Sequence, residues 1–168
     1  MAARSNTARR NTARADRDID LLVAILRFAS IISRPMRDGV ADPARLSSKE
    51  LQLLMALSGE GESAGHDLAE MMGMHAMNVS RALASLRAMR LIEPVENSAN
   101  RRRKPFRISA RGATAYHAMK PNIARIAHYL LGVLSPRERA QLRTLLSKLD
   151  ARVMQWQPSE RRPHVPRA

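Results

Sequence analysis

The sequence contains no cysteine and few aromatic residues. Without cysteine in its 168 residues, the chain has no disulfide, no thiolate metal site and no thiol-based redox sensor. Aromatic residues make up 3% of the chain and hydrophobic residues 45%, so a core must be built from aliphatic side chains and Met. Helices accept such side chains readily, whereas strands are enriched in aromatic and β-branched residues. The composition therefore predicts a mostly helical protein of one domain with extended ends.

Long hydrophobic runs and enzyme signatures are also missing. No apolar run approaches the roughly 20 residues that a membrane span needs, so we expect a cytoplasmic, nucleoid-associated protein with no membrane partner. The sequence has no Gly-rich phosphate loop and no nucleophile elbow, and its acidic residues are scattered. His117 and His128 are separated by Pro121, and no carboxylate cluster accompanies them. We therefore predict no enzyme activity, no cofactor and no metal site.

Basic residues are what the sequence has in excess. Twenty-nine Lys and Arg against fifteen Asp and Glu give a formal net charge of +14. Such a surplus attracts polyanions, above all nucleic acid, although a merely soluble basic protein would also fit it. The charge is concentrated, because no acidic residue lies between Asn97 and Arg111. The cluster comprises Arg101, Arg102, Arg103, Lys104 and Arg107.

The ends of the chain differ from its middle. Residues 1–15 are rich in Arg and poor in apolar residues, so they predict a disordered basic tail, and residues 156–168 predict a disordered Pro/Arg tail. Residues 16–37 predict a helix that ends near Pro35. This helix carries two apolar stripes, which require its own domain and a partner subunit to bury them.

Capping residues place several further helices. Ser47 followed by Glu50 predicts a capping box that opens a second helix, and Ser135 predicts the cap of the last one. Ser63 is the expected cap of a short helix that begins near residue 66. Ser109 is the expected cap of a long helix that Pro121 should kink or divide.

Residues 67–108 predict a short helix, a tight turn, a second helix and a basic β-hairpin. Gly73 supplies the positive φ that the turn needs, and the helix after it has an apolar inner face. An ordinary helical hairpin would show the same pattern, but a basic hairpin tip would repel itself without a partner such as a narrow minor groove. The predicted DNA-contacting residues are His75, Ala76, Met77, Asn78, Ser80 and Arg81 in the second helix and Arg101, Arg102, Arg103 and Lys104 at the tip.

Five segments then make residues 16–153 resemble a known family. They are LAEMMG at 68–73, VSRALASL at 79–86, NRR at 100–102, ISARG at 108–112 and LSPRER at 134–139. In this order and spacing they are similar to the MarR (multiple-antibiotic-resistance regulator) type of winged helix-turn-helix regulators. The chain departs from that pattern at Asn100, where Asp is usual, at Arg90, where Gly usually ends the recognition helix, and at His75, which replaces a Ser-like cap.

The resemblance implies a mainly α fold with a small β-hairpin wing and interlocking terminal helices. It divides the chain into a tail at 1–15, a dimerisation helix at 16–37, a winged helix-turn-helix domain at 46–109, C-terminal dimerisation helices at 110–155 and a tail at 156–168. It implies a homodimer that binds a pseudo-palindromic site in double-stranded DNA and a repressor relieved by a small molecule, often an aromatic acid, at residues the sequence does not identify. The alternatives are a sequence-nonspecific architectural DNA-binding protein and an interaction module that has lost DNA binding.

Overall fold

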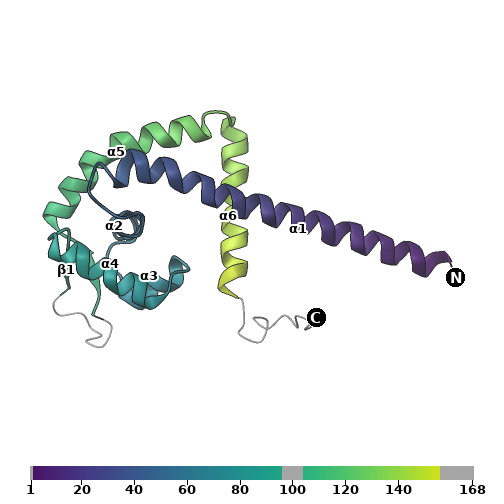
Figure 1. The fold of residues 1–168 in the computed structure, drawn as a ribbon, viewed down its shortest axis with the longest axis horizontal. Coiled ribbons are helices and arrows are strands. Elements are labelled where there is room, and N and C mark those ends of the chain that lie inside the picture. The colour runs from purple at the N-terminus through teal and green to yellow at the C-terminus, as the bar shows by residue number, and fades with distance from the viewer. Residues whose placement is uncertain (1, 96–103, 156–168) are drawn as a thin grey trace. The chain divides into compact units, whose positions relative to one another are not determined.

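The computed structural model describes residues 2–95 and 104–155, with side chains from residue 14 onward (Figure 1). The chain forms two compact units, Met1–Ile126 and Ala127–Ala168. Its elements are α1 (Ala2–Met36), the π-helical turn η1 (Arg37–Ala41), α2 (Ser48–Glu60), α3 (Gly65–Met71), α4 (Ala76–Ala88), β1 (Ile92–Pro94), β2 (Phe106–Ile108), α5 (Ala110–Leu131) and α6 (Pro136–Met154). The mainly helical fold with one β-hairpin is the predicted one.

The first helix is longer than the sequence predicted. α1 begins at Ala2, so the structure has helix where residues 2–15 were expected to be disordered. The expectation considered only the lack of core-forming residues. The segment contains no Gly or Pro and is rich in Ala and Arg, which are good helix formers, and extending an existing helix is far easier than nucleating one. Residues 156–168, the other predicted tail, lie outside the described residues.

The core of the first unit is centred on α2. Its capping box forms as predicted, because the Ser47 amide donates to the Glu50 carboxylate over 2.6 Å and the Glu50 amide donates to Oγ of Ser47 over 3.3 Å. Leu53 and Leu54 are completely buried. α2 packs against α4, where Val79, Leu83 and Leu86 are buried. The apolar inner face that the sequence predicted for the helix after Gly73 is therefore part of the core.

The helix-turn-helix contains one correction. The N-cap of α3 is Ala64, not Ser63, and it makes no side-chain cap bond. Ser63 instead pairs with Phe106 of β2, and their two backbone hydrogen bonds measure 2.9 and 3.0 Å. A side chain that satisfies a capping pattern cannot cap a helix when its backbone is held in a β-bridge. Gly73 has φ +59°, as predicted for the turn between α3 and α4.

The hairpin and α5 follow the predicted order. β1 pairs antiparallel with β2, with Glu93 opposite Arg107. The Ser109 hydroxyl accepts a hydrogen bond from the Gly112 amide, so it caps α5 as expected. α5 is not divided at Pro121 but runs unbroken to Leu131, since an established helix can accommodate one Pro at the loss of one backbone hydrogen bond.

The second unit has little core of its own. α6 opens with the predicted capping box, in which Ser135 bonds to the backbone and side chain of Glu138. None of its residues is buried, although it carries an apolar stripe of five large side chains, Leu142, Leu145, Leu146, Leu149 and Val153. Within the described residues, no helix is both long and apolar enough to cross a membrane.

Candidate nucleic-acid interface

The outer face of α4 presents the residues that the sequence selected. His75, Ala76, Ser80 and Arg81 are exposed and Asn78 is half-buried. Met77 is 65% exposed, although Met is an apolar side chain that usually fills gaps in a core. The structure therefore gathers polar donors and one exposed apolar side chain at the start of a single helix, which is the combination that base edges and thymine methyl groups accept.

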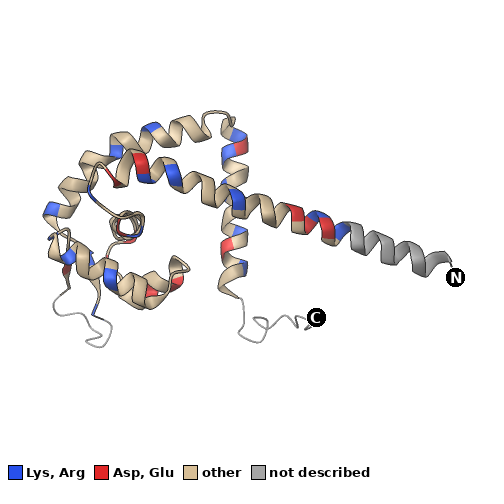
Figure 2. Cartoon of the chain, in the orientation of Figure 1, with Lys and Arg blue, Asp and Glu red and all other residues tan. Residues whose placement is uncertain are grey.

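The N-terminus of α4 is suited to an anion. His75 is its N-cap residue and makes no side-chain hydrogen bond to the first turn, in agreement with the poor capping expected of His. The first turn contains no acidic residue, and neither does the rest of α4 (Figure 2). Backbone N–H groups that no side chain caps, at the positive end of a helix dipole, can receive a phosphate.

A groove of about 470 Å³ lies between α4, the start of α3 and the hairpin. One face of α4 lines the groove with three small side chains followed by one cation: Ala76, Ser80, Ala84 and Arg87. The remaining lining residues are Gly65, His66, Leu83, Lys104 and Phe106. Among the described residues, no acidic side chain lines the groove, so a phosphate backbone could approach closely between Arg87 and Lys104.

Sequence reasoning identified only part of this groove. It selected Ala76, Ser80 and Lys104 but missed Arg87 and His66. The recurrence of small residues every three to four positions from Ala76 to Arg87 was the available signal. The three predicted tip residues Arg101, Arg102 and Arg103 lie outside the described residues.

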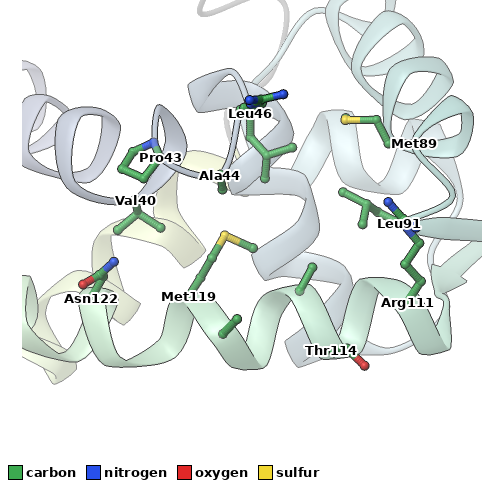
Figure 3. A pocket seen from close by; sticks show the side chains of 13 residues that line it. Val40, Pro43, Ala44, Leu46, Met89, Leu91, Arg111, Thr114, Met119 and Asn122 are labelled. Carbon is green, nitrogen blue, oxygen red and sulfur yellow. The ribbon is translucent and has the colours of Figure 1, made fainter.

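A second cavity, of about 840 Å³, lies beside the end of α4 (Figure 3). Its walls come from η1 and the loop after it, the residues around the α4–β1 junction, and α5. The lining residues are Val40, Pro43, Ala44, Arg45, Leu46, Met89, Leu91, Arg111, Thr114, Ala115, Ala118, Met119 and Asn122. Figure 3 shows Arg111 extending from α5 towards Leu91. An apolar cavity with two cations and no acid suits a small apolar molecule that bears a negative charge.

Metal binding has no structural support in the part of the chain that the structure describes. No group of three or more His, Asp or Glu side chains there is arranged to hold a metal ion. His66 lies beside Asp67, with Nε2 3.0 Å from Oδ1, and this pair has no third ligand among the described residues.

Comparison with known proteins agrees with this geometry. A family model described as MarR family matches residues 46–103, and none of the curated proteins matches the chain. A MarR family transcriptional regulator from Silicibacter pomeroyi has the same fold with a TM-score of 0.71 at 22% identity, over 77% of this chain and 86% of that chain. A mutant of MarR from E. coli complexed with operator DNA gives a TM-score of 0.66 at 17% identity, over 78% of this chain and 94% of that chain.

A third structure of this fold is BpsR from Bordetella bronchiseptica, described with the regulation of its DNA binding by 6-hydroxynicotinic acid. It gives a TM-score of 0.63 at 21% identity, over 75% of this chain and 89% of that chain. At these identities the structural neighbours show a common fold, and the family match covers the helix-turn-helix and the first strand of the wing. Residues 46–103 of this chain are therefore similar to the MarR family, and the chain as a whole shares the fold of these winged-helix regulators.

Proposed function

We propose that the protein is a homodimeric repressor that reads a pseudo-palindromic operator with α4 and releases it when a small ligand binds. The observation that carries the proposal is the outer face of α4, where Met77 is 65% exposed among polar donors on a helix without acidic residues. The E. coli MarR mutant of the same fold, complexed with operator DNA, supports a DNA-bound form of this architecture.

Each side chain of this face has a chemically distinct role. Asn78 and Arg81 are the candidates for bidentate hydrogen bonds to adenine and guanine, while Ala76 and Met77 offer apolar contacts to thymine methyl groups. His75 and Ser80 position the helix through phosphates, as do Arg87 and Lys104 on the two sides of the groove. Minor-groove contact remains a prediction for the residues of the hairpin tip, Arg101, Arg102 and Arg103.

Exposed apolar surface supports a homodimer. α1 exposes large apolar side chains around its circumference, including Leu22 at 55% and Leu26 at 59%. α6 exposes a second stripe, including Leu145, Leu146 and Leu149. Contiguous apolar faces of this size are unusual on a soluble monomer. On both helices the exposed apolar side chains continue along the whole apolar part of the helix. We therefore assign a second copy of the chain as the partner that covers these side chains.

The second cavity is the proposed ligand site. Its apolar walls would hold a flat or aliphatic body, and Arg111 or Arg45 would pair with an anionic group. Regulation of BpsR by 6-hydroxynicotinic acid makes an aromatic acid a reasonable first probe. A panel of hydroxylated benzoic and nicotinic acids should include one that dissociates the DNA complex. The same compound should act at least tenfold more weakly on Arg111→Gln, and an undiminished effect would place the ligand elsewhere.

Selection of bound duplexes from a random DNA library tests the DNA-binding proposal. At about 150 mM salt, nonspecific phosphate binding is suppressed. We expect enrichment of a pseudo-palindrome whose half-sites lie about one helical turn apart. Retained binding with no enriched motif would favour the architectural protein, in which α4 serves only packing. No binding would favour the interaction module.

A further inference from the structure

One arginine of the basic cluster is already paired. Arg107 lies on β2 directly opposite Glu93 on β1. Its Nε and Nη2 each lie 2.8 Å from Oε1 of Glu93, so two N–H groups of the guanidinium contact the same carboxylate oxygen. Its third nitrogen, Nη1, lies 3.9 Å from Oε1 of Glu62. One cation therefore sits between two carboxylates.

Glu62 belongs to the segment that leads into the helix-turn-helix. The residue after it, Ser63, forms the β-bridge with Phe106, which places this segment beside β2 as a third strand-like partner. α3 begins two residues further on, at Gly65. Arg107 thus connects both strands of the hairpin with the polypeptide that enters α3.

We infer that Arg107 is a positioning residue, which fixes the wing relative to α3 and α4 through Glu93 and Glu62 and does not itself bind DNA. The inference rests on the proposed DNA-binding function and gives a separate role to Arg107, which the sequence places in the basic cluster but not among the predicted DNA-contacting residues. Two carboxylates around one guanidinium leave no positive charge for a phosphate. Arg87 and Lys104, in contrast, line a groove whose described lining residues include no acidic side chain, which favours phosphate binding there.

The salt dependence of DNA binding separates the two roles. Each phosphate neutralised by a cation contributes about 0.9 to the slope of log K against log salt concentration. Arg107→Gln should weaken operator binding by about three- to fivefold, the scale of an exposed ion pair, and leave the slope unchanged. Arg87→Gln, the matched control, should lower the slope by about 0.9.

Replacing Glu93 distinguishes a positioning role of Arg107 from a phosphate-binding role, because the two roles predict opposite changes in operator affinity. If Arg107 positions the wing, Glu93→Gln should weaken operator binding, because the ion pair that joins β2 to β1 is lost. If Arg107 were a phosphate ligand restrained by its neighbour, Glu93→Gln would strengthen binding and steepen the slope. The exchange Glu93→Arg with Arg107→Glu restores the pair across the hairpin but places a second carboxylate beside Glu62. It should therefore recover only part of the affinity that Arg107→Gln loses.

The decisive experiment measures affinity for a duplex of the selected motif between about 0.1 and 0.3 M salt for the wild type and these four variants. Urea unfolding of each variant confirms that it is folded at the temperature used. An unchanged slope for Arg107→Gln, with weaker binding by Glu93→Gln, is the expected result. A slope lowered by about 0.9 for Arg107→Gln, or tighter binding by Glu93→Gln, would overturn the inference while the proposed function stands. Failure of the wild type and of Arg87→Gln to bind any motif would instead refute the proposed function.

Discussion

The hydroxyl of Ser109 donates a 2.7 Å hydrogen bond to the backbone carbonyl of Arg90. Arg90 has φ +58°, a left-handed conformation that Gly adopts more readily, and it lies in the turn that follows α4. The same hydroxyl accepts a 3.0 Å hydrogen bond from the Gly112 amide in the first turn of α5. One buried side chain therefore fixes the end of α4 to the beginning of α5, where the second cavity also has its walls.

Loss of this hydroxyl should destabilise the fold. Ser109→Ala removes an N-cap and leaves the Arg90 carbonyl without its side-chain donor, so the free energy of unfolding should fall by about 1–2 kcal/mol. Urea denaturation measures it. Ser109→Thr keeps the hydroxyl and serves as the control, which should lose clearly less. Equal losses for the two variants would show that the hydrogen bonds contribute nothing measurable.

Gly112 is required by close packing. A Cβ built there would lie 1.9 Å from the Leu91 carbonyl oxygen, a backbone atom that cannot move aside alone. Gly112→Ala should therefore lower the free energy of unfolding by about 1–3 kcal/mol or more, as overpacking does. Gly59→Ala is the matched control, because Gly59 lies in α2 with nothing within 4 Å of the added Cβ. This control should be neutral or more stable by up to about 1 kcal/mol. A Gly112→Ala protein as stable as the wild type would contradict the packing.

Glu50 should make stability depend on pH. Partial burial raises the pKa of its carboxyl, but hydrogen bonds from the Ser85 side chain and from the amide and hydroxyl of Ser47 lower it, and the net pKa lies below its ordinary value. A lowered folded-state pKa stabilises the protein above the ordinary pKa of about 4.3, and this contribution disappears as the pH falls through the folded-state value. The wild type should exceed Glu50→Gln in urea midpoint at neutral pH. The difference should shrink below about pH 4, and a constant difference would contradict this account.

The proposed dimer depends on the apolar stripe of α6. Leu146 is 49% exposed in the isolated chain, so Leu146→Glu should cost the monomer little and place a charge in the proposed interface. Sedimentation should show a dimer for the wild type and a shift of at least tenfold in the dissociation constant for the variant. Gln141→Glu adds the same charge at another exposed position of α6 and should leave the dimer intact. A dimeric Leu146→Glu protein would move the interface away from this stripe.

Sequence reasoning succeeded where local chemistry decides the structure. Capping boxes at Ser47 and Ser135, the positive φ of Gly73 and the inner face of α4 all follow from patterns within a few residues. It failed where a residue distant in the sequence determines the local structure. Ser63 was expected to cap a helix, but its backbone forms a β-bridge with Phe106 instead.

The candidate site shows the same division. The leading residues of α4 followed from helical spacing, whereas the groove and the second cavity each combine elements far apart in the sequence. The pairing of Arg107 with Glu93 depends on the register of the hairpin, which the charge cluster alone does not reveal. The length of α1 was misjudged because a lack of core residues was equated with a lack of helix.

The most direct test of the central claim, that α4 reads bases in two half-sites, repeats the DNA selection with Arg81→Ala and Asn78→Ala. Both residues lie on the outer face of α4, where truncation should leave the fold intact. Each variant should still enrich a pseudo-palindrome but lose preference at one base pair in each half-site, at symmetric positions, with a loss of about 1–3 kcal/mol for the original base pair. Motifs identical to that of the wild type would show that another surface reads the DNA and would contradict the account.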